Sequence, residues 1–316
     1  MTVLVSGSIA RDAVFFHEGA FARQLEAGDV RYVNTTFLAP RMRRDYGGCA
    51  ANISAAMRRL GGDPLPWGVV GEDDADYLRR FDSLGIRTEG VARIAGERTA
   101  ECVILTDSEG AQISAFHPGA LAHGAEAPWP RIKGRDAAPA LAILSPAGQE
   151  ATLRAARECV SRGVPFLFDV GQELPLFTRE ELLALLDASF GIACSDFECE
   201  AFARTTGLRP VDIARMGRLV LHTHGARGAS LWEPKASESL HVEAIPVRAR
   251  NAVGAGDAMR GGFLAGLERG LAPLESARLG AVAAARKVAG ESAQDYALTL
   301  DAAREDYARM WGDAPF

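Results

Sequence analysis

The chain has 316 residues, of which 48% are hydrophobic and 24% charged, and its formal net charge is −6. The length allows one large domain, and the composition is that of an ordinary globular protein rather than a disordered or fibrous one. The negative balance argues against sequence-independent nucleic-acid binding, which needs a basic face.

Five cysteines are scattered along the chain without paired Cys-x-x-Cys spacing. We therefore expect buried thiols in a reducing compartment rather than disulfides or a zinc site. The first predicted strand, residues 2–6, follows Met1 directly and leaves no room for a signal peptide. No apolar run approaches membrane length. We expect a cytoplasmic protein that binds neither a membrane nor nucleic acid.

Strands and helices alternate along most of the chain. After the opening strand we expect a helix over residues 50–60, a strand over 67–70 and a helix over 75–84. From residue 140 the alternation is regular, with strands at 141–144, 165–168, 190–194 and 218–221, intervening helices at 151–161, 179–186 and 196–205, and closing helices at 256–269, 273–289 and 301–311. Apolar strands between helices predict an α/β fold with a parallel sheet covered on both faces.

Two segments break this rhythm. Residues 13–45 contain a strand-like run, 30–37, with no room for a helical crossover, and residues 100–117 have the pattern of a hairpin with strands at 102–106 and 111–116. We expect the two insertions, at about 13–45 and 97–118, to pair into a small β-lid over one sheet edge. No linker or repeat is evident, so we expect residues 1–316 to form a single domain.

The most informative stretch is residues 251–263. A strand-like run over 240–247 leads to Gly254-Ala255-Gly256, and an amphipathic helix follows. Small residues there let backbone N–H groups and the helix dipole converge on an anion. Asp257 stands in the first turn, where a carboxylate beside a bound phosphate is suited to take the proton of an attacking hydroxyl. Ordinary helix starts also carry glycine and Asp, so the stretch alone leaves both interpretations open.

Together with Gly47-Gly48-Cys49-Ala50-Ala51-Asn52, the run Gly254–Asp257 resembles the two signatures of the ribokinase-like (PfkB-type) sugar and nucleoside kinases. The chain looks most similar to bacterial adenosine kinases and broad-specificity nucleoside kinases. That closer likeness rests on residues 6–12, 37–40, 116–120, 169–172 and 195–198. The resemblance implies a three-layer α/β/α core with a mostly parallel central sheet, an active site at the carboxyl ends of the strands, and a β-sheet lid.

The resemblance also implies a reaction. Asp257 matches the family's general base, and the backbone of Gly254, Ala255 and Gly256 matches its anion hole. The implied reaction transfers the γ-phosphate of ATP, with Mg²⁺, to the 5′-hydroxyl of a purine nucleoside in purine salvage. Adenosine is the implied substrate, with inosine and guanosine as further candidates. A homodimer through the lid stays open.

Asp12 follows the first strand, and its carboxylate can accept two hydrogen bonds at once, which suits the 2′ and 3′ hydroxyls of ribose. With Gly48 and Asn52 it matches the family's sugar-binding positions. Taken alone, Asp12 could be a loop residue and Gly47-Gly48 a plain turn. Phe116 could stack on a base, although a hairpin aromatic can equally belong to a core. Other positions that line the pocket in similar kinases are Ser8, Thr36, Gly47, Gln112 and Gln172.

On the nucleotide side, Thr223, Gly225 and Gly228 resemble the family's Thr-x-Gly-x-x-Gly motif after the strand at 218–221. Arg227 could reach a phosphate of ATP or remain a solvated surface residue. Glu198 matches the acidic residue that orders magnesium through water, while Ser195 stands where the family usually has Asn. Neighbouring histidines, 222 and 224, receive no metal role.

The chain departs from the family at Asn251, where Asp is common, and over residues 291–294. Both changes bear on a monovalent-cation site, so a need for K⁺ stays open. Two alternative functions also remain: a ribokinase- or fructokinase-like sugar kinase, and a non-enzymatic nucleoside or nucleotide sensor. Gln112 and Phe116 favour a nucleoside because a free sugar needs no platform for a base, and an intact Asp257 argues against the sensor.

Overall fold

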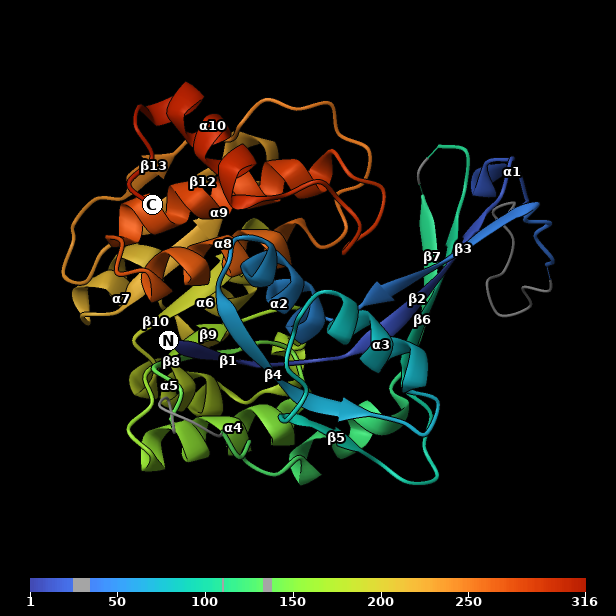
Figure 1. Cartoon of the computed structure of the whole chain (residues 1–316), viewed down its shortest axis with the longest axis horizontal. Coiled ribbons are helices and arrows are strands. Elements are labelled where there is room, and N and C mark those ends of the chain that lie inside the picture. The colour runs from blue at the N-terminus through green and yellow to red at the C-terminus, as the bar shows by residue number, and fades with distance from the viewer. Residues whose placement is uncertain (25–34, 110, 133–137) are drawn as a thin grey trace.

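The computed structural model describes residues 1–24, 35–109, 111–132 and 138–316 (Figure 1). These residues form a nine-stranded sheet in the order β13-β12-β11-β10-β9-β8-β1-β4-β5. All pairs from β5 to β11 are parallel, and the last two pairs, β11–β12 and β12–β13, are antiparallel. The strands are β1 (Thr2–Ser6), β4 (Asp63–Val70), β5 (Val91–Arg93), β8 (Leu141–Leu144), β9 (Phe166–Asp169), β10 (Gly191–Ser195), β11 (Leu219–Thr223), β12 (Ala229–Trp232) and β13 (Leu240–Val242).

Helices cover both faces of this sheet, as Figure 1 shows for α8 and α9 on one side and α4 and α5 on the other. Successive side chains of a strand point to opposite faces, so Val3 and Val5 pack with one helical layer while Leu4 packs with the other. The helices are α1 (Phe21–Gln24), α2 (Cys49–Arg59), α3 (Ala75–Ser83), α4 (Gln149–Ser161), α5 (Arg179–Ala188), α6 (Asp196–Thr206), α7 (Pro210–Arg215), α8 (Ala255–Glu268), α9 (Pro273–Val288) and α10 (Leu300–Trp311), with short 3₁₀ helices at Gly119–Glu126, Leu174–Leu176 and Gly225–Arg227.

A smaller, mostly antiparallel sheet projects from one end of the core (Figure 1). Its order is β3-β2-β6-β7, with β2 at Ala10–Phe16, β3 at Arg41–Gly47, β6 at Ala100–Thr106 and β7 at Gln112–His117. The register places Asp45, Asp12, Cys102 and Phe116 in one row across the four strands. Cross-strand partners share a face, so these four side chains belong to the same face, which we call the inner face.

The predicted second sheet is confirmed, but one of its predicted strands is wrong. Residues 35–39 are irregular, and residues 30–34 of the expected strand 30–37, like Gly110 of the hairpin turn, lie outside the described residues. Phe37 instead packs against Phe21, with ring centroids 4.9 Å apart. The strand that pairs with β2 is β3, whose Arg-Met-Arg-Arg start hides the usual alternation of apolar and polar residues.

The strand expected over 240–247 ends at Val242. It is an edge strand paired with β12, and Pro246 lacks the N–H that a ladder uses. The five cysteines are all free. Cys159, Cys194 and Cys199 are buried as expected, whereas Cys49 and Cys102 are partly exposed. Among the described residues, no helix is long and apolar enough to cross a membrane.

Candidate active site

The predicted site residues gather where the parallel strands end. Strands β1, β9, β10 and β11 end at Ser6, Asp169, Ser195 and Thr223, so the loops that follow them meet at one edge of the large sheet. In open α/β sheets ligands bind in the crevice outside this carboxyl edge. The topology therefore brings together chain segments that lie more than 200 residues apart.

Gly254 begins the helix that carries the predicted base. Its φ of 79° lies in the left-handed region, and a Cβ there would come within 3.0 Å of Ala293 Cβ. The turn closes with a hydrogen bond of 3.0 Å from the Ala255 N–H to the Ala252 carbonyl. Of the three amides expected to form an anion hole, Ala255 therefore already has an acceptor. The amides of Gly254 and Gly256 are the better candidates for an anion at this helix start.

Asp257 lies in the first turn of α8 and is held from α2. Asn52 Nδ2 donates a hydrogen bond of 2.8 Å to Asp257 Oδ2. Burial raises the pKa of Asp257, while the bond from Asn52 and the charge of Arg260 oppose this shift. The residue keeps partial exposure. A carboxylate with a raised pKa is a stronger base, and its fixed geometry suits proton abstraction.

A hydrogen-bonded chain connects this carboxylate to the small sheet. Gln294 Nε2 donates to Asn52 Oδ1 and to the Tyr77 hydroxyl, each at 3.1 Å. The Tyr77 hydroxyl in turn donates to the Gly47 carbonyl. Both Gln294 and Tyr77 are fully buried, so removing either end of this series of hydrogen bonds leaves a buried polar group without its partner. This chain fixes Asp257 relative to β3.

Asp12 lies beside Gly47 on the neighbouring strand β2. A Cβ at Gly47 would stand 2.5 Å from Asp12 Oδ2, so only glycine leaves that carboxylate its place. Burial, followed by the charges of Asp45 and Asp257, raises the pKa of Asp12 to about 6. The next residue, Gly48, has a φ of 91°, and a Cβ there would lie 2.5 Å from the Ser8 carbonyl. The Asp12 carboxylate thus requires glycine at position 47, and the close backbone of residues 8–10 requires it at position 48.

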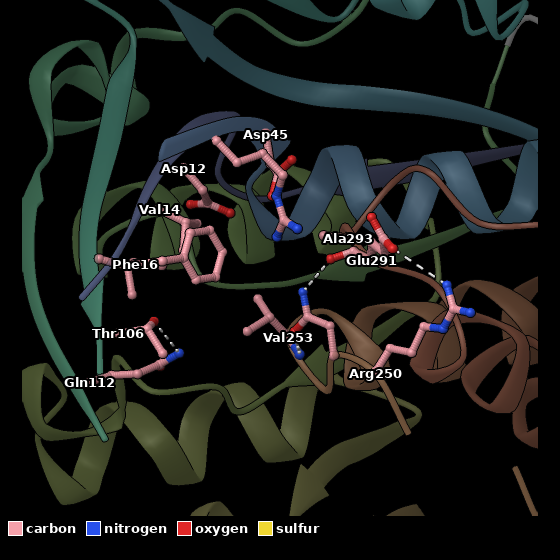
Figure 2. Close-up of a pocket in the computed structure, with 13 residues that line it drawn as sticks. Asp12, Val14, Phe16, Asp45, Thr106, Gln112, Arg250, Val253, Glu291 and Ala293 are labelled. Atoms are coloured by element: carbon pink, nitrogen blue, oxygen red, sulfur yellow. Dashed lines mark hydrogen bonds and ion pairs between the residues drawn. The ribbon is translucent and has the colours of Figure 1, made fainter. Parts of the chain in front are cut away.

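A pocket of about 410 Å³ opens between the inner face of the small sheet and the loops at 250–253 and 291–293. Figure 2 shows Asp12, Phe16 and Gln112 on one side and Val253 and Glu291 on the other. The pocket combines an apolar wall with a carboxylate near the predicted base. Its lining residues are Asp12, Val14, Phe16, Arg43, Asp45, Ile104, Thr106, Gln112, Arg250, Asn251, Val253, Glu291 and Ala293.

The other predicted substrate residues lie outside this lining. Thr36, Phe116 and Gln172 are exposed, and Phe116 shares the inner face with Asp12 two strands away. Ser8 accepts a hydrogen bond of 3.0 Å from the Cys49 N–H and so anchors the start of α2. The aromatic ring in the pocket wall is Phe16, which the sequence interpretation missed although its alternation on β2 placed it on the same face as Asp12.

Behind the base lies a buried charge cluster. Arg260 Nε donates to Asp169 Oδ1 at 2.6 Å, and Arg260 Nη2 lies 3.6 Å from Glu198 Oε2. Burial opposes the charge on Arg260, but Asp169, Glu198 and Asp257 outweigh it and raise the pKa of the guanidinium. Arg260 was not predicted as a site residue. The cluster holds a positive charge one helical turn from Asp257.

Ser195 and Glu198 form a capping box at the start of α6. Glu198 Oε2 accepts from the Ser195 N–H at 2.7 Å, and Ser195 Oγ accepts from the Glu198 N–H at 3.4 Å. Ser therefore fills the capping role that Asn also performs. A carboxylate already engaged by an amide and a guanidinium fits Mg²⁺ through water better than as a direct ligand.

The run from Thr223 to Gly228 forms a tight turn after β11. Gly225 and Gly228 have φ values of 59° and 89°, and Thr223 Oγ1 donates to the Cys194 carbonyl at 3.4 Å. Arg227 Nη2 lies 2.6 Å from Asp196 Oδ2, so the arginine has a protein partner and is not merely solvated. The turn exposes backbone at the sheet edge, where a nucleotide can approach.

Residues 2–299 match the pfkB family carbohydrate kinase domain. The chain belongs to the pfkB family. A nucleoside kinase from Burkholderia thailandensis, solved in complex with inosine, is 34% identical with a TM-score of 0.88, and the match covers 99% of both chains. The same enzyme solved with ADP and inosine has a TM-score of 0.85, over 99% of this chain and 97% of that one.

Two further relatives extend the comparison. A nucleoside kinase from Methanothermobacter thermautotrophicus is 28% identical over 313 residues, which cover 96% of this chain and 98% of that protein. An ATP-dependent ribose-1-phosphate kinase from Halopiger xanaduensis is 31% identical over 245 residues, which cover 71% of this chain and 73% of that protein. The fold is accordingly the ribokinase-like α/β fold, with a large mostly parallel sheet and a smaller sheet.

The two segments that the sequence links to a monovalent-cation site, Asn251 and residues 291–294, are joined by hydrogen bonds within the protein. Asn251 Nδ2 donates to the Glu291 carbonyl at 2.7 Å, and Lys287 Nζ donates to the Asn251 carbonyl at 2.7 Å. Lys287 is fully buried, and that burial lowers the pKa of its ammonium group to about 8. A cation needs such carbonyl oxygens as ligands. Each of these carbonyls accepts one hydrogen bond from the protein, and the Lys287 ammonium beside the Asn251 carbonyl disfavours a second cation there.

Proposed function

We propose that the protein is an ATP-dependent nucleoside kinase that phosphorylates the 5′-hydroxyl of a purine nucleoside. The observation that carries this proposal is the full-length similarity to the Burkholderia thailandensis nucleoside kinase solved with inosine and with ADP and inosine. The arrangement of Asp257, Asn52 and Asp12 supports it, because it offers a base and a hydroxyl acceptor at one sheet edge.

In this mechanism Asp12 accepts hydrogen bonds from the 2′ and 3′ hydroxyls, and Gly48 and Asn52 complete the ribose site. Asp257 takes the proton of the 5′-hydroxyl while the hydroxyl oxygen forms a bond to the γ-phosphorus of ATP. The bond from that phosphorus to the bridging oxygen breaks, and ADP leaves. Amides of Gly254, Ala255 and Gly256 surround the transferring group, those of Gly254 and Gly256 being free of the Ala252 turn. Arg260 supplies nearby positive charge.

The nucleotide is proposed to lie against Thr223, Gly225 and Gly228, with Arg227 exchanging Asp196 for a phosphate. When bound, Mg²⁺ would neutralise charge on the phosphates. Glu198, near its cap with Ser195, is the residue proposed to hold it through water. The enzyme is proposed to work without K⁺. The hydrogen bonds from Asn251 to the Glu291 carbonyl and from Lys287 to the Asn251 carbonyl already join the two loops where a cation would bind.

Recognition of the base is assigned to the small sheet acting as a lid. Gln112 lines the pocket, and Phe116 shares the inner face, so closure would bring both toward a bound purine. Ser8, Thr36 and Gln172 are proposed to complete this side. Adenosine, inosine and guanosine are the proposed substrates, in a purine salvage role at a cytoplasmic location. The opposite face of the sheet exposes Met42, Val103 and Ile113, which supports a homodimer through the lid.

A sugar-phosphate kinase is the second candidate, favoured by the similarity to the ribose-1-phosphate kinase. Arg43 and Arg250 line the pocket and could receive a phosphate. Both, however, have carboxylate partners: Arg43 Nε lies 2.6 Å from Asp45, and Arg250 Nη1 lies 3.4 Å from Glu291. A phosphate would have to displace these carboxylates, so the nucleoside remains the better fit.

The test is ADP release with adenosine, inosine, guanosine, cytidine, ribose and ribose 1-phosphate as separate substrates, with each product identified by mass spectrometry. We expect the highest kcat/KM with a purine nucleoside and a nucleoside 5′-monophosphate as the product. Higher kcat/KM with ribose 1-phosphate would establish the second candidate. Nucleoside binding without any product would identify a sensor instead.

A further inference from the structure

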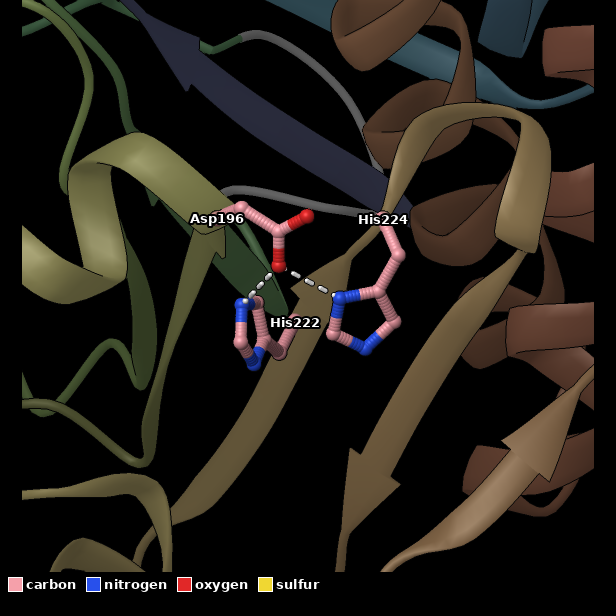
Figure 3. A group of neighbouring side chains, drawn as sticks. All are labelled: Asp196, His222 and His224. Carbon is pink, nitrogen blue, oxygen red and sulfur yellow. Dashed lines mark hydrogen bonds and ion pairs between the residues drawn. The ribbon is translucent and has the colours of Figure 1, made fainter.

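A separate group of polar side chains joins the start of α6 to the end of β11. Figure 3 shows His222 and His224 pointing at the carboxylate of Asp196. His224 Nδ1 lies 2.6 Å and His222 Nε2 3.0 Å from the same oxygen, Asp196 Oδ1. All three atoms lie within 4.8 Å of one another, and each can act as a metal ligand.

These separations are shorter than those between two ligands bound to one metal ion. Two ligands bound to one zinc ion at about 2.0–2.2 Å in tetrahedral geometry are roughly 3.4 Å apart. The two histidines would thus move away from Asp196 Oδ1 by less than about 1 Å to admit an ion. Asp196 is exposed and both histidines are partly exposed, so a movement of this size is within reach of side-chain rotation.

The atoms around the triad hold its ligands in orientation. The other ring nitrogen of His224, Nε2, lies 2.8 Å from Ser230 Oγ. The His222 ring forms a hydrogen bond with the Cys199 thiol. Arg227 binds Asp196 through Oδ2, at 2.6 Å, and leaves Oδ1 directed at the histidines. Outer partners of this kind fix the tautomer and direction of metal-binding histidines.

One atom of the triad is incompletely satisfied. His222 Nε2 is shielded from solvent and makes no well-aligned hydrogen bond to any described residue, although it lies 3.0 Å from the carboxylate oxygen. Its close approach to the carboxylate lacks hydrogen-bond alignment, so the atom is only partly satisfied. A metal ion between the three side chains would satisfy it.

We propose that Asp196, His222 and His224 form a binding site for a transition-metal ion of the zinc class. Two imidazoles and one carboxylate favour zinc, cobalt, nickel or copper over magnesium and calcium, which prefer oxygen ligands. Three protein ligands leave a fourth position for water. The site is separate from Glu198, which points to Ser195 and Arg260.

The test uses the full-length protein, dialysed against a chelator and then against buffer, without nucleotide. Zn²⁺ binding is measured by calorimetry, and Co²⁺ binding by its visible absorption. We expect one tight ion per chain and the intense absorption of a tetrahedral cobalt site. Asp196→Asn and His224→Gln should each weaken Zn²⁺ binding at least tenfold, and Ser230→Ala should weaken it less. Circular dichroism checks that each variant is folded.

His123→Ala is the matched control. His123 also lies between two carboxylates, but it faces Glu126 through Nδ1 and Glu97 through Nε2, so its donors do not converge. This variant should bind Zn²⁺ like the wild type. The proposal is overturned if the wild type binds no stoichiometric ion, if folded Asp196→Asn and His224→Gln both retain its affinity, or if His123→Ala abolishes binding.

Discussion

Gly47→Ala should impair nucleoside binding through Asp12 without affecting the general base, Asp257. The new Cβ would stand 2.5 Å from Asp12 Oδ2, so the carboxylate must retreat by about 0.9 Å to reach the 3.4 Å of ordinary contact. A displacement of that size breaks a hydrogen bond to a ribose hydroxyl. Hydrogen bonds to charged groups contribute about 1.5–3 kcal/mol, so losing one should raise the nucleoside KM by about 10- to 150-fold.

Gly62→Ala provides the matched control. Neither glycine has a φ in the left-handed region, and a Cβ at Gly62 would also meet a carboxylate oxygen, Glu268 Oε2, at 2.6 Å. Steady-state kinetics and thermal unfolding are measured for both variants. We expect similar losses of stability, an unchanged ATP KM in both, and a raised inosine KM in Gly47→Ala alone. Equal inosine KM values in the two variants would refute the placement of Asp12 on the ribose.

Three further outcomes are expected. Because the pKa of Asp12 is about 6 in the free protein, the inosine KM should rise as the pH falls below that value, while the KM for ATP stays level; parallel changes in both would point to a different group. Activity in KCl, NaCl and tetramethylammonium chloride should agree within about twofold, since Lys287 and Asn251 occupy the loop carbonyls, and a tenfold stimulation by K⁺ would contradict this. Hydrogen exchange in β6 and β7 should slow when inosine and a nucleotide are added, and unchanged exchange would remove the lid role from the small sheet.

The core elements were predictable because each buries a periodic apolar face. The strand expected at 190–194 is Gly191–Ser195, and the helix expected at 256–269 is Ala255–Glu268, with Phe263 and Leu264 fully buried. Strand β3 was missed because its arginines lie on a thinly covered sheet. Few side chains of this strand are buried, so its sequence lacks the alternation of apolar and polar residues that predicts a strand.

The candidate site was predictable only where a local motif carries its geometry. Gly48 and Gly254 have the positive φ values that their turns require, and Asp257 stands in the first turn of its helix as expected. The hydrogen bond between Gln294 and Tyr77 joins residues 217 positions apart, and no sequence pattern around either residue predicts a contact with the other. Arg260 looked like one residue of an amphipathic helix, and only its contact with Asp169 from β9 identifies it as a buried charge.

Asp257→Asn tests most directly whether Asp257 acts as the general base of a nucleoside kinase. The amide is nearly isosteric and can still pair with Asn52, so inosine affinity measured by calorimetry should change little. Loss of proton abstraction should lower kcat for ADP release by about two to four orders of magnitude. A folded variant that binds inosine normally and keeps more than about a tenth of the wild-type kcat would contradict the account.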